Sequence, residues 1–184
     1  MEATRHRITE AAMELHGTIG PARTTMTAVA ERAGVQRQTV YRHFADEEEL
    51  FSACSGHFVA QHPSPELARW RAITDPADRL RSALDELYAW YESTEAMWTN
   101  VLRDATLVPA IGPNLAPFLA YLDEAAHTLA AGWGARGRRR ATLLAATRHA
   151  VDFHTWRSLA RDGDVSRSDV IELTSAMVGR GAGA

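Results

Sequence analysis

The sequence predicts an all-α protein, and two observations support that fold class. Apolar residues recur at i, i+3, i+4 and i+7 through most of the chain, as at Ile8, Ala11, Ala12 and Leu15, and this spacing is typical of amphipathic helices. Glycine and proline interrupt the pattern between segments, and no segment alternates apolar with polar residues as a half-buried strand does. We therefore expect a succession of helices and no sheet.

Three short helices are expected within the first 45 residues. The first covers residues 4–17, where the apolar spacing begins and a glycine ends it. Thr24 and Thr25 offer N-caps for the second helix, which stops at Gly34. The third covers residues 36–44.

Longer helices are expected in the rest of the chain. Asp46 and Glu49 have the spacing of a capping box, which predicts a fourth helix that runs to about Gln61. A long helix begins at Asp75-Pro76, and we expect it to break near Ser93-Thr94. Prolines punctuate the next segment, and further helices are expected from Leu115 to Trp133, from Arg138 to Arg161 and from Ser166 to Arg180.

Residues 25–43 have the layout of a helix-turn-helix, in which one helix holds another rigidly in the major groove of DNA. Gly34 suits a turn with positive φ, and Val35 can fill the angle between the helices. Val40 and Phe44 can face inward, while Arg, Gln, Thr, Tyr and His side chains face out as donors for phosphates and bases. We therefore expect a three-helix DNA-binding domain at residues 1–48 and a larger helical domain at residues 49–184.

The composition is that of a globular protein, with 46% hydrophobic and 23% charged residues. Because the net charge is -3, DNA binding must depend on the local motif and not on overall attraction. No apolar run approaches the roughly 20 residues of a membrane helix, and residues 1–7 do not resemble a secretory signal. We expect a cytoplasmic protein without a membrane partner, and Cys54 alone cannot form an intrachain disulfide.

The segment TTMTAVAERAGVQRQTVYRHFADEEELF resembles the DNA-binding signature of the TetR family of bacterial regulators, and the resemblance covers Ile8 to about Phe51. It implies a phosphate contact at the start of the second helix, base contacts early in the third helix and further phosphate contacts later in it. The implied DNA-binding residues are Thr25 for a phosphate, Arg37, Gln38 and Thr39 for the major groove, Tyr41 and His43 for phosphates, and Arg42 for either. The alternative is a helical corner whose polar side chains are only solvated.

Two residues depart from the family's pattern. Position 36 is often Ser in the family, where it caps the recognition helix, and Gln36 caps poorly. Position 47 is commonly Lys, placed to meet a phosphate, and Glu47 reverses that charge. Acidic residues do suit the positive end of a helix dipole, so Glu47 has a structural role that accounts for it, but we expect a modest DNA affinity.

All five tryptophans lie beyond the helix-turn-helix, and large rings in a helical body suit an apolar pocket with few polar groups. The resemblance implies a pocket among the middle helices whose occupation shifts the two DNA-binding heads apart. The candidate effector-binding residues are Trp90, Trp98, Phe118, Tyr121, Phe153 and Trp156. The alternative is that these rings simply fill the core.

The last two predicted helices are apolar on more than one side, and such helices must be covered on each. The resemblance implies that they form a four-helix bundle between two subunits. The candidate dimer-interface residues are Leu144, Val151, Leu159, Val170, Leu173 and Met177. The alternative is that both helices complete the core of one subunit.

Together these features predict a homodimeric, sequence-specific transcriptional regulator. We expect a repressor that a small apolar or aromatic effector releases from a palindromic double-stranded DNA operator. A regulator that responds to a protein partner or to no ligand, or that activates transcription, is the alternative.

An enzyme is not expected, because the sequence has no Gly-rich phosphate loop, nucleophile motif or plausible carboxylate pair, and we assign no catalytic residue. No cofactor or metal is expected either. His149 and His154 are five residues apart, off the spacing that shares one helix face, and Cys54 with His57 has no third or fourth ligand nearby in the sequence.

Overall fold

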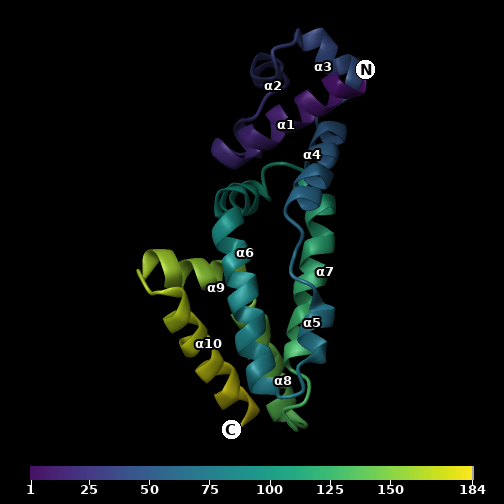
Figure 1. The fold of residues 1–184 in the computed structure, drawn as a ribbon. Helices are drawn as coiled ribbons and strands as arrows, with labels where there is room; N and C mark the ends of the chain where they lie inside the picture. Colours follow the sequence, from purple (N-terminus) through teal and green to yellow (C-terminus); the bar gives the residue numbers. More distant parts are fainter. Residues whose placement is uncertain (184) are drawn as a thin grey trace. The chain divides into compact units, whose positions relative to one another are not determined.

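A computed structural model describes residues 1–183, which are mostly helical and contain no strand, so the predicted all-α class is confirmed (Figure 1). The helices are α1 (Glu2–Thr18), α2 (Met26–Ala33), α3 (Arg37–His43), α4 (Glu47–Gln61), α5 (Leu67–Ala72), α6 (Pro76–Asp104), α7 (Ile111–Leu129), α8 (Arg138–Ala150), α9 (Phe153–Arg157) and α10 (Arg167–Ala182). A 3-10 turn, η1 (Pro21–Arg23), precedes α2, and a π-helical turn, η2 (Ser158–Asp162), follows α9.

The chain divides into two compact units. Unit 1 holds residues 1–63 and 94–116, and unit 2 holds residues 64–93 and the chain from Pro117 onward. Both α6 and α7 contribute residues to each unit. The expected boundary between residues 48 and 49 falls inside α4, which lies in unit 1, and the division of function at that boundary stays a prediction.

The core of unit 1 brings the first four helices together. Ile8 of α1, Val29 of α2, Val40 of α3 and Leu50 of α4 are buried in one apolar cluster. Phe44, which follows α3, is fully buried in the same cluster, so the inward orientation predicted for the third helix is correct. Each helix therefore contributes its apolar stripe to one shared core, and this fixes which face of α3 remains outside.

Local capping determines where the helices of unit 1 begin. The Thr25 side chain accepts a hydrogen bond from the N–H of Ala28, and Asp46 accepts one from the N–H of Glu49. The Glu49 carboxylate in turn accepts from the N–H of Ala45, one residue before the expected partner. The predicted starts of the second and fourth helices are thus confirmed.

The break expected in the long helix near Ser93-Thr94 is wrong, because α6 continues from Pro76 to Asp104. Ser93 donates its hydroxyl hydrogen bond to the carbonyl of Trp90 one turn earlier, an arrangement that is compatible with a helix interior. The pair of hydroxyl residues Ser93 and Thr94 therefore does not end the helix, contrary to the expectation from the sequence. The division between the two units nevertheless falls between Ser93 and Thr94.

The helix that was expected to begin at Leu115 begins four residues earlier, in spite of the prolines in this segment. α7 begins at Ile111, so Pro113 lies in its first turn, where a missing N–H costs nothing, and Pro117 lies inside the helix. The Asn114 side chain donates to the carbonyl of Ala110 just before the helix. Leu67–Ala72 forms α5, a short helix that the sequence pattern did not predict.

The single helix expected from Arg138 to Arg161 is wrong, because the chain turns at Val151-Asp152 between α8 and α9. Asp152 caps α9 by accepting a hydrogen bond from the N–H of Thr155. Two buried tyrosines of α6 satisfy the carbonyls at the turn: the Tyr88 hydroxyl donates to Ala150 at 2.8 Å and the Tyr91 hydroxyl to Val151 at 2.6 Å. The turn between α8 and α9 is therefore stabilised by two residues of α6 that are far away in the sequence.

Candidate DNA interface and aromatic cluster

The turn between α2 and α3 is closed by the backbone. Gly34 has φ 64° and ψ 40°, the left-handed conformation that was expected of it and that favours glycine. The N–H of Gly34 donates to the carbonyl of Glu31, and the N–H of Val35 donates to that of Ala30, which is the Schellman arrangement. Val35 packs against the apolar core. The angle between the two helices is thus fixed by two hydrogen bonds and one apolar contact.

The outer face of α3 presents polar side chains to solvent. Arg37, Gln38, Tyr41 and Arg42 are exposed, while Thr39 is half-buried. Arg37 donates a hydrogen bond to the Tyr41 hydroxyl at 3.1 Å, and its guanidinium carbon lies 5.3 Å from the centre of the Tyr41 ring. This contact holds one arginine of the outer face along the helix before any DNA is present.

Two further implied phosphate contacts lie at helix ends. Thr25 is exposed at the start of α2; its oxygen accepts the capping hydrogen bond, so its proton is available to donate. His43 is half-buried at the end of α3, and its carbonyl accepts a hydrogen bond from Arg5 at 2.6 Å. Arg5 also lies 4.1 Å from the Phe44 ring centre and 3.5 Å from the Glu49 carboxylate. α1 thereby ties the end of α3 to the start of α4.

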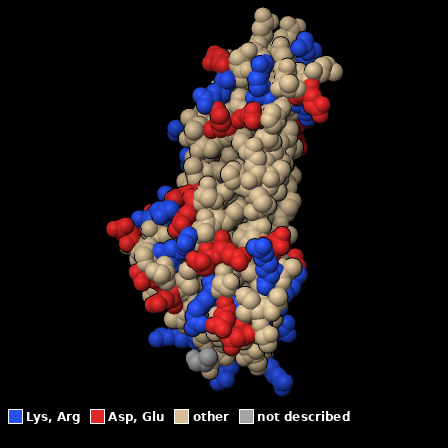
Figure 2. Space-filling model, in the orientation of Figure 1, with Lys and Arg blue, Asp and Glu red and all other residues tan. Residues whose placement is uncertain are grey.

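Both departures from the family's pattern can be located. Gln36 precedes α3 without a side-chain cap hydrogen bond, as expected. Glu47 is exposed in the first turn of α4, beside two other acidic residues of that turn. On the face that Figure 2 shows, arginine side chains are interspersed with acidic ones at the end of the molecule that holds the helix-turn-helix.

The end of α6 is hydrogen-bonded to α1 and η1 within unit 1. The Asn100 carboxamide donates to the carbonyls of His16 and Gly17, and the Asp104 carboxylate accepts from the N–H of Ala22. The hydrogen bond from Arg103 lowers the pKa of the Asp104 carboxyl below its usual range. Gly20 has φ 94° and lies so close to this carboxylate that a Cβ would overlap it. These contacts secure the C-terminal end of α1.

His16 and Cys54 form a buried polar pair beneath this region, with Nδ1 and Sγ 3.3 Å apart. Burial lowers the pKa of His16 to about 4 and raises the pKa of Cys54 to about 12. Both side chains are therefore neutral near pH 7, and Cys54 is an unreactive thiol. The Cys54 and His57 pairing considered from the sequence does not form, because Cys54 turns to His16.

Five of the six candidate effector-binding residues lie in unit 2, where they form a chain of ring contacts. Phe118 lies between Trp90 and Tyr121, with ring centres 5.6 and 6.1 Å away. Tyr91, which the sequence pattern did not single out, links Trp90 to the remaining two rings: its centre is 5.6 Å from Trp90, and it contacts both Phe153 at 5.2 Å and Trp156 at 5.5 Å. Trp98 lies in unit 1 and contacts Phe58 there instead.

The cluster is packed and contains one polar hydrogen without a partner. Tyr91 and Trp156 are fully buried and Phe153 nearly so, which is also what a filled core requires. The Trp156 Nε1–H is buried and has no hydrogen-bond partner among the described residues. Two hollows of unit 2, of about 220 and about 400 Å³, are lined by other residues, including His127 and Arg140 for the first and Trp133 and Glu172 for the second.

The candidate dimer residues differ in exposure. Val151 and Val170 are buried inside unit 2, so they have little surface to offer to a second chain. Leu173 is 54% exposed on α10, a large value for leucine. Leu144, Leu159 and Met177 are half-buried. α8 and α10 pack side by side, and Leu173 is the strongest remaining candidate for a contact between chains.

Residues 8–54 match the model of a family described as "Bacterial regulatory proteins, tetR family". This match covers the helix-turn-helix whose geometry is given above. The similarity to this family is thus located in the part of the chain that forms α1 to the first half of α4.

Solved structures resemble this chain along nearly its whole length. A candidate fatty acid metabolism regulator of Clostridium perfringens shares 18% identity, with a TM-score of 0.68 over 94% of this chain and 97% of that one. A TetR-like transcriptional regulator of Rhodococcus sp. RHA1 shares 18%, with a TM-score of 0.67 over 100% and 98%. A candidate transcriptional regulator of Saccharomonospora viridis in complex with choline shares 17%, with a TM-score of 0.68 over 97% of each chain. At these identities the likeness concerns the fold.

No protein with a curated description matches the chain. Among the described residues, no helix is both long enough and apolar enough to cross a membrane.

Proposed function

We propose that this chain is a tetR-family repressor that binds a palindromic DNA operator through α3. The observation that supports this proposal is the division of α3 into two faces. Val40 is buried in the core, whereas Arg37, Gln38 and Arg42 are exposed and can enter a major groove. Residues 1–48 would then act as the DNA-binding part, and the chain from residue 49 as the ligand-binding and dimerisation part.

The residues of the interface have different roles in this proposal. Arg37, Gln38 and Thr39 read base edges, and Arg37 forms the bidentate contact that suits guanine. Thr25, Tyr41 and His43 bind phosphates, which position the helix without reading sequence, and Arg42 reaches either. The Tyr41 hydroxyl accepts from Arg37 and keeps its own proton for a phosphate oxygen.

A small effector would bind at the rings of unit 2, within the set Trp90, Phe118, Tyr121, Phe153 and Trp156. An apolar site with one unpaired donor favours a ligand that is mostly apolar or aromatic and carries a hydrogen-bond acceptor. The Trp156 Nε1–H would donate to that acceptor. Trp98, which lies in unit 1, would respond to the ligand indirectly or not at all.

α6 is the element through which binding of an effector would affect binding of DNA. It is one continuous helix that carries Trp90 in unit 2 and ends at Asp104, which is hydrogen-bonded to the backbone after α1 in unit 1. A ligand that moves Trp90 would act on the same helix that holds the end of α1. Release of DNA requires only that the ligand bind the DNA-incompetent conformation more tightly than the other one.

A homodimer completes the proposal, because two recognition helices about one DNA turn apart match a palindrome. The contact would be made by α8, η2 and α10, and its candidate residues are Leu144, Leu159, Leu173 and Met177. Buried Val151 and Val170 would support these residues from within the subunit.

The experiment starts from fragments of the source genome that the purified protein selects. Fluorescence anisotropy then measures which compounds release a selected fragment: aromatic acids, fatty acids and, because a protein of similar fold was solved with it, choline. We expect release by an apolar or aromatic compound, lost in Trp156→Phe but kept in Trp133→Phe. If the selected fragments share no recurrent sequence, the proposal of a specific operator is overturned. If no compound releases the DNA, the proposal of a small-molecule effector is overturned.

A further inference from the structure

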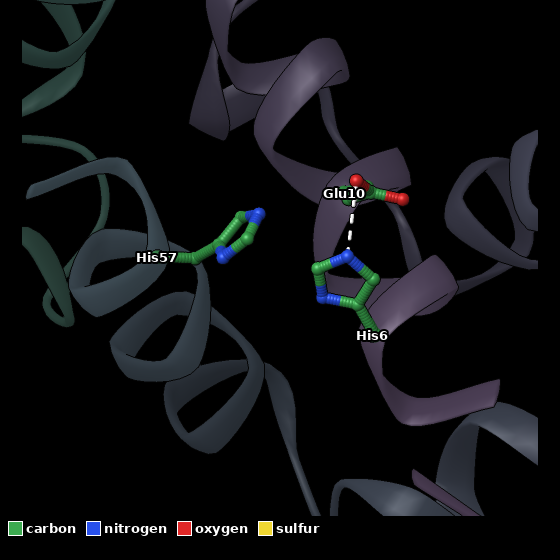
Figure 3. Close-up of side chains that lie close together, drawn as sticks. All are labelled: His6, Glu10 and His57. Carbon is green, nitrogen blue, oxygen red and sulfur yellow. Dashed lines mark ion pairs between the residues drawn. The ribbon is translucent and has the colours of Figure 1, made fainter. Parts of the chain in front are cut away.

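A histidine and a glutamate on α1 meet a histidine on α4 within unit 1. His6 and Glu10 lie one turn apart on the same face of α1, and His6 Nε2 is 3.2 Å from Glu10 Oε1. The His57 ring of α4 stands at 89° to the His6 ring, with the ring centres 4.9 Å apart. Figure 3 shows the three side chains directed toward one another from the two helices.

The three side chains offer the ligand set of a transition-metal site. One ligand atom from each residue lies within 4.8 Å of the other two. In a tetrahedral zinc site, with bonds of about 2.0–2.1 Å, ligand atoms are about 3.3 Å apart, so closure needs a movement of about 1.5 Å. His6 and Glu10 are 55% and 43% exposed and can make that movement by changing rotamer. His57 is half-buried, and the Gln61 carboxamide, 2.9 Å from Nε2, restrains its ring.

We propose that His6, Glu10 and His57 bind a divalent transition metal of the zinc class and thereby bridge α1 and α4. Two imidazoles and one carboxylate suit Zn²⁺, Co²⁺, Ni²⁺ or Cu²⁺ better than Mg²⁺ or Ca²⁺, which prefer oxygen ligands. Three protein ligands leave a coordination position for water, as in zinc sites that keep an open position. The metal site is independent of the proposed operator and effector, whereas its effect on DNA binding rests on the proposed function.

The bridge would act on the DNA-binding part of unit 1. Arg5, the neighbour of His6, donates to the carbonyl of His43 at the end of α3 and faces Glu49 at the start of α4. A metal ion would restrain α1 at the next residue and hold α4 against it. We therefore expect the ion to stabilise the arrangement in which α3 is held, and to tighten DNA binding.

The test uses the full chain, with any affinity tag removed and residual metal stripped by a chelator. Isothermal titration with Zn²⁺ and absorption spectroscopy with Co²⁺ measure affinity, stoichiometry and coordination. We expect about one ion per chain, with Co²⁺ bands of nitrogen and oxygen ligation. His57→Ala and His6→Ala should each weaken binding at least about tenfold, the order of loss seen when the surroundings of a metal ligand are altered. His154→Ala, at an exposed histidine of unit 2, should bind as the wild type does.

Two further measurements test whether the ion joins α1 to α4 and whether it acts on DNA binding. Equal melting temperatures of the metal-free variants and wild type show that the variants fold, and Zn²⁺ should then raise the melting temperature of the wild type alone. Zn²⁺ affinity that is unchanged in His57→Ala would place the ion on α1 only and overturn the bridge. Anisotropy with the selected DNA should show severalfold tighter binding with Zn²⁺ in the wild type and no change in His57→Ala. Equal DNA affinity with and without Zn²⁺ in the wild type overturns the link to DNA.

Discussion

The Asn100 carboxamide nitrogen donates hydrogen bonds to the carbonyl oxygens of both His16 and Gly17, each at 3.0 Å. These carbonyls lie at the end of α1, where a helix leaves acceptors without intrahelical partners. One buried side chain of α6 therefore satisfies two acceptors of another helix.

Asn100→Ala should lower the free energy of unfolding by about 1–3 kcal/mol, because it leaves buried carbonyls without a donor. Urea unfolding followed by circular dichroism measures the loss. Ser93→Ala is the matched control, since Ser93 is exposed and bonds only within α6, and it should change stability by less than about 0.5 kcal/mol. Equal effects of the two substitutions would argue against a special role for Asn100.

Arg37→Ala should relax the preference for one base per half-site, by roughly 1–3 kcal/mol of discrimination. Tyr41→Phe keeps the ring under the Arg37 guanidinium but removes the hydroxyl, and His43→Ala removes a candidate phosphate donor. Both should weaken all sequences alike. Selection of DNA from random pools, with sequencing, separates these patterns. An unchanged base preference in Arg37→Ala would mean that Arg37 is not one of the residues that contact bases.

Glu47→Lys should strengthen binding to specific and nonspecific DNA together. A lysine there would neutralise one phosphate per subunit, and the slope of log affinity against log salt should steepen by about two for a dimer. Anisotropy across a salt series measures the slope. Glu66→Lys, an equal charge change at an exposed residue of unit 2, is the control and should leave the slope unaltered. The same slope in Glu47→Lys and wild type would mean that residue 47 points away from the phosphates.

Leu173→Glu should give a monomer, because it places a charge at the most exposed large apolar side chain of α10. Sedimentation velocity at micromolar concentration measures the state of assembly, and DNA affinity should fall with loss of the second head. Glu172→Gln at the neighbouring exposed residue should remain dimeric. A monomeric wild type would refute the interface.

Stability should fall as the pH drops from about 6.5 toward 4. The pKa of His16 is about 4 in the folded chain and near 6.5 when unfolded, so the unfolded state binds the proton first in this window. The loss can reach about 3 kcal/mol, at about 1.4 kcal/mol per unit of pKa difference. Denaturant unfolding at several pH values should show this fall in the wild type and a flatter profile in His16→Gln. The lowered pKa of Asp104 adds a further loss that begins as the pH falls through the ordinary pKa range of carboxyl groups and continues below it.

Much of unit 1 could be predicted from the sequence because its signals are local. Thr25, Gly34 and Asp46 each determine a helix end through neighbours within four residues, and the structure confirms all three. Val40 was placed in the core by its spacing from Phe44, and both are buried. Because caps and turns act over one turn of chain, a linear reading can find them.

Features that depend on distant partners were missed. Tyr88 and Tyr91 stabilise the turn after α8 from residues about 60 positions away, and Asp152 looked like one more residue of a long helix. In the cluster of His6, Glu10 and His57, the residue of α4 is more than 40 positions away from the two residues of α1. Its available signal was the four-residue spacing of His6 and Glu10, which alone is a common surface pair.

The placement of the tryptophans has an optical consequence. Trp70 and Trp156 are fully buried in unit 2, whereas Trp98 of unit 1 is in ring contact with Phe58 on α4. The helix-turn-helix contains tyrosine but no tryptophan. Fluorescence emission excited at the red edge of the tryptophan absorption band would therefore carry no signal from α3. In a Trp98→Phe variant, this emission would come from unit 2 alone. The difference between the wild-type spectrum and the variant spectrum would give the emission of Trp98 in unit 1.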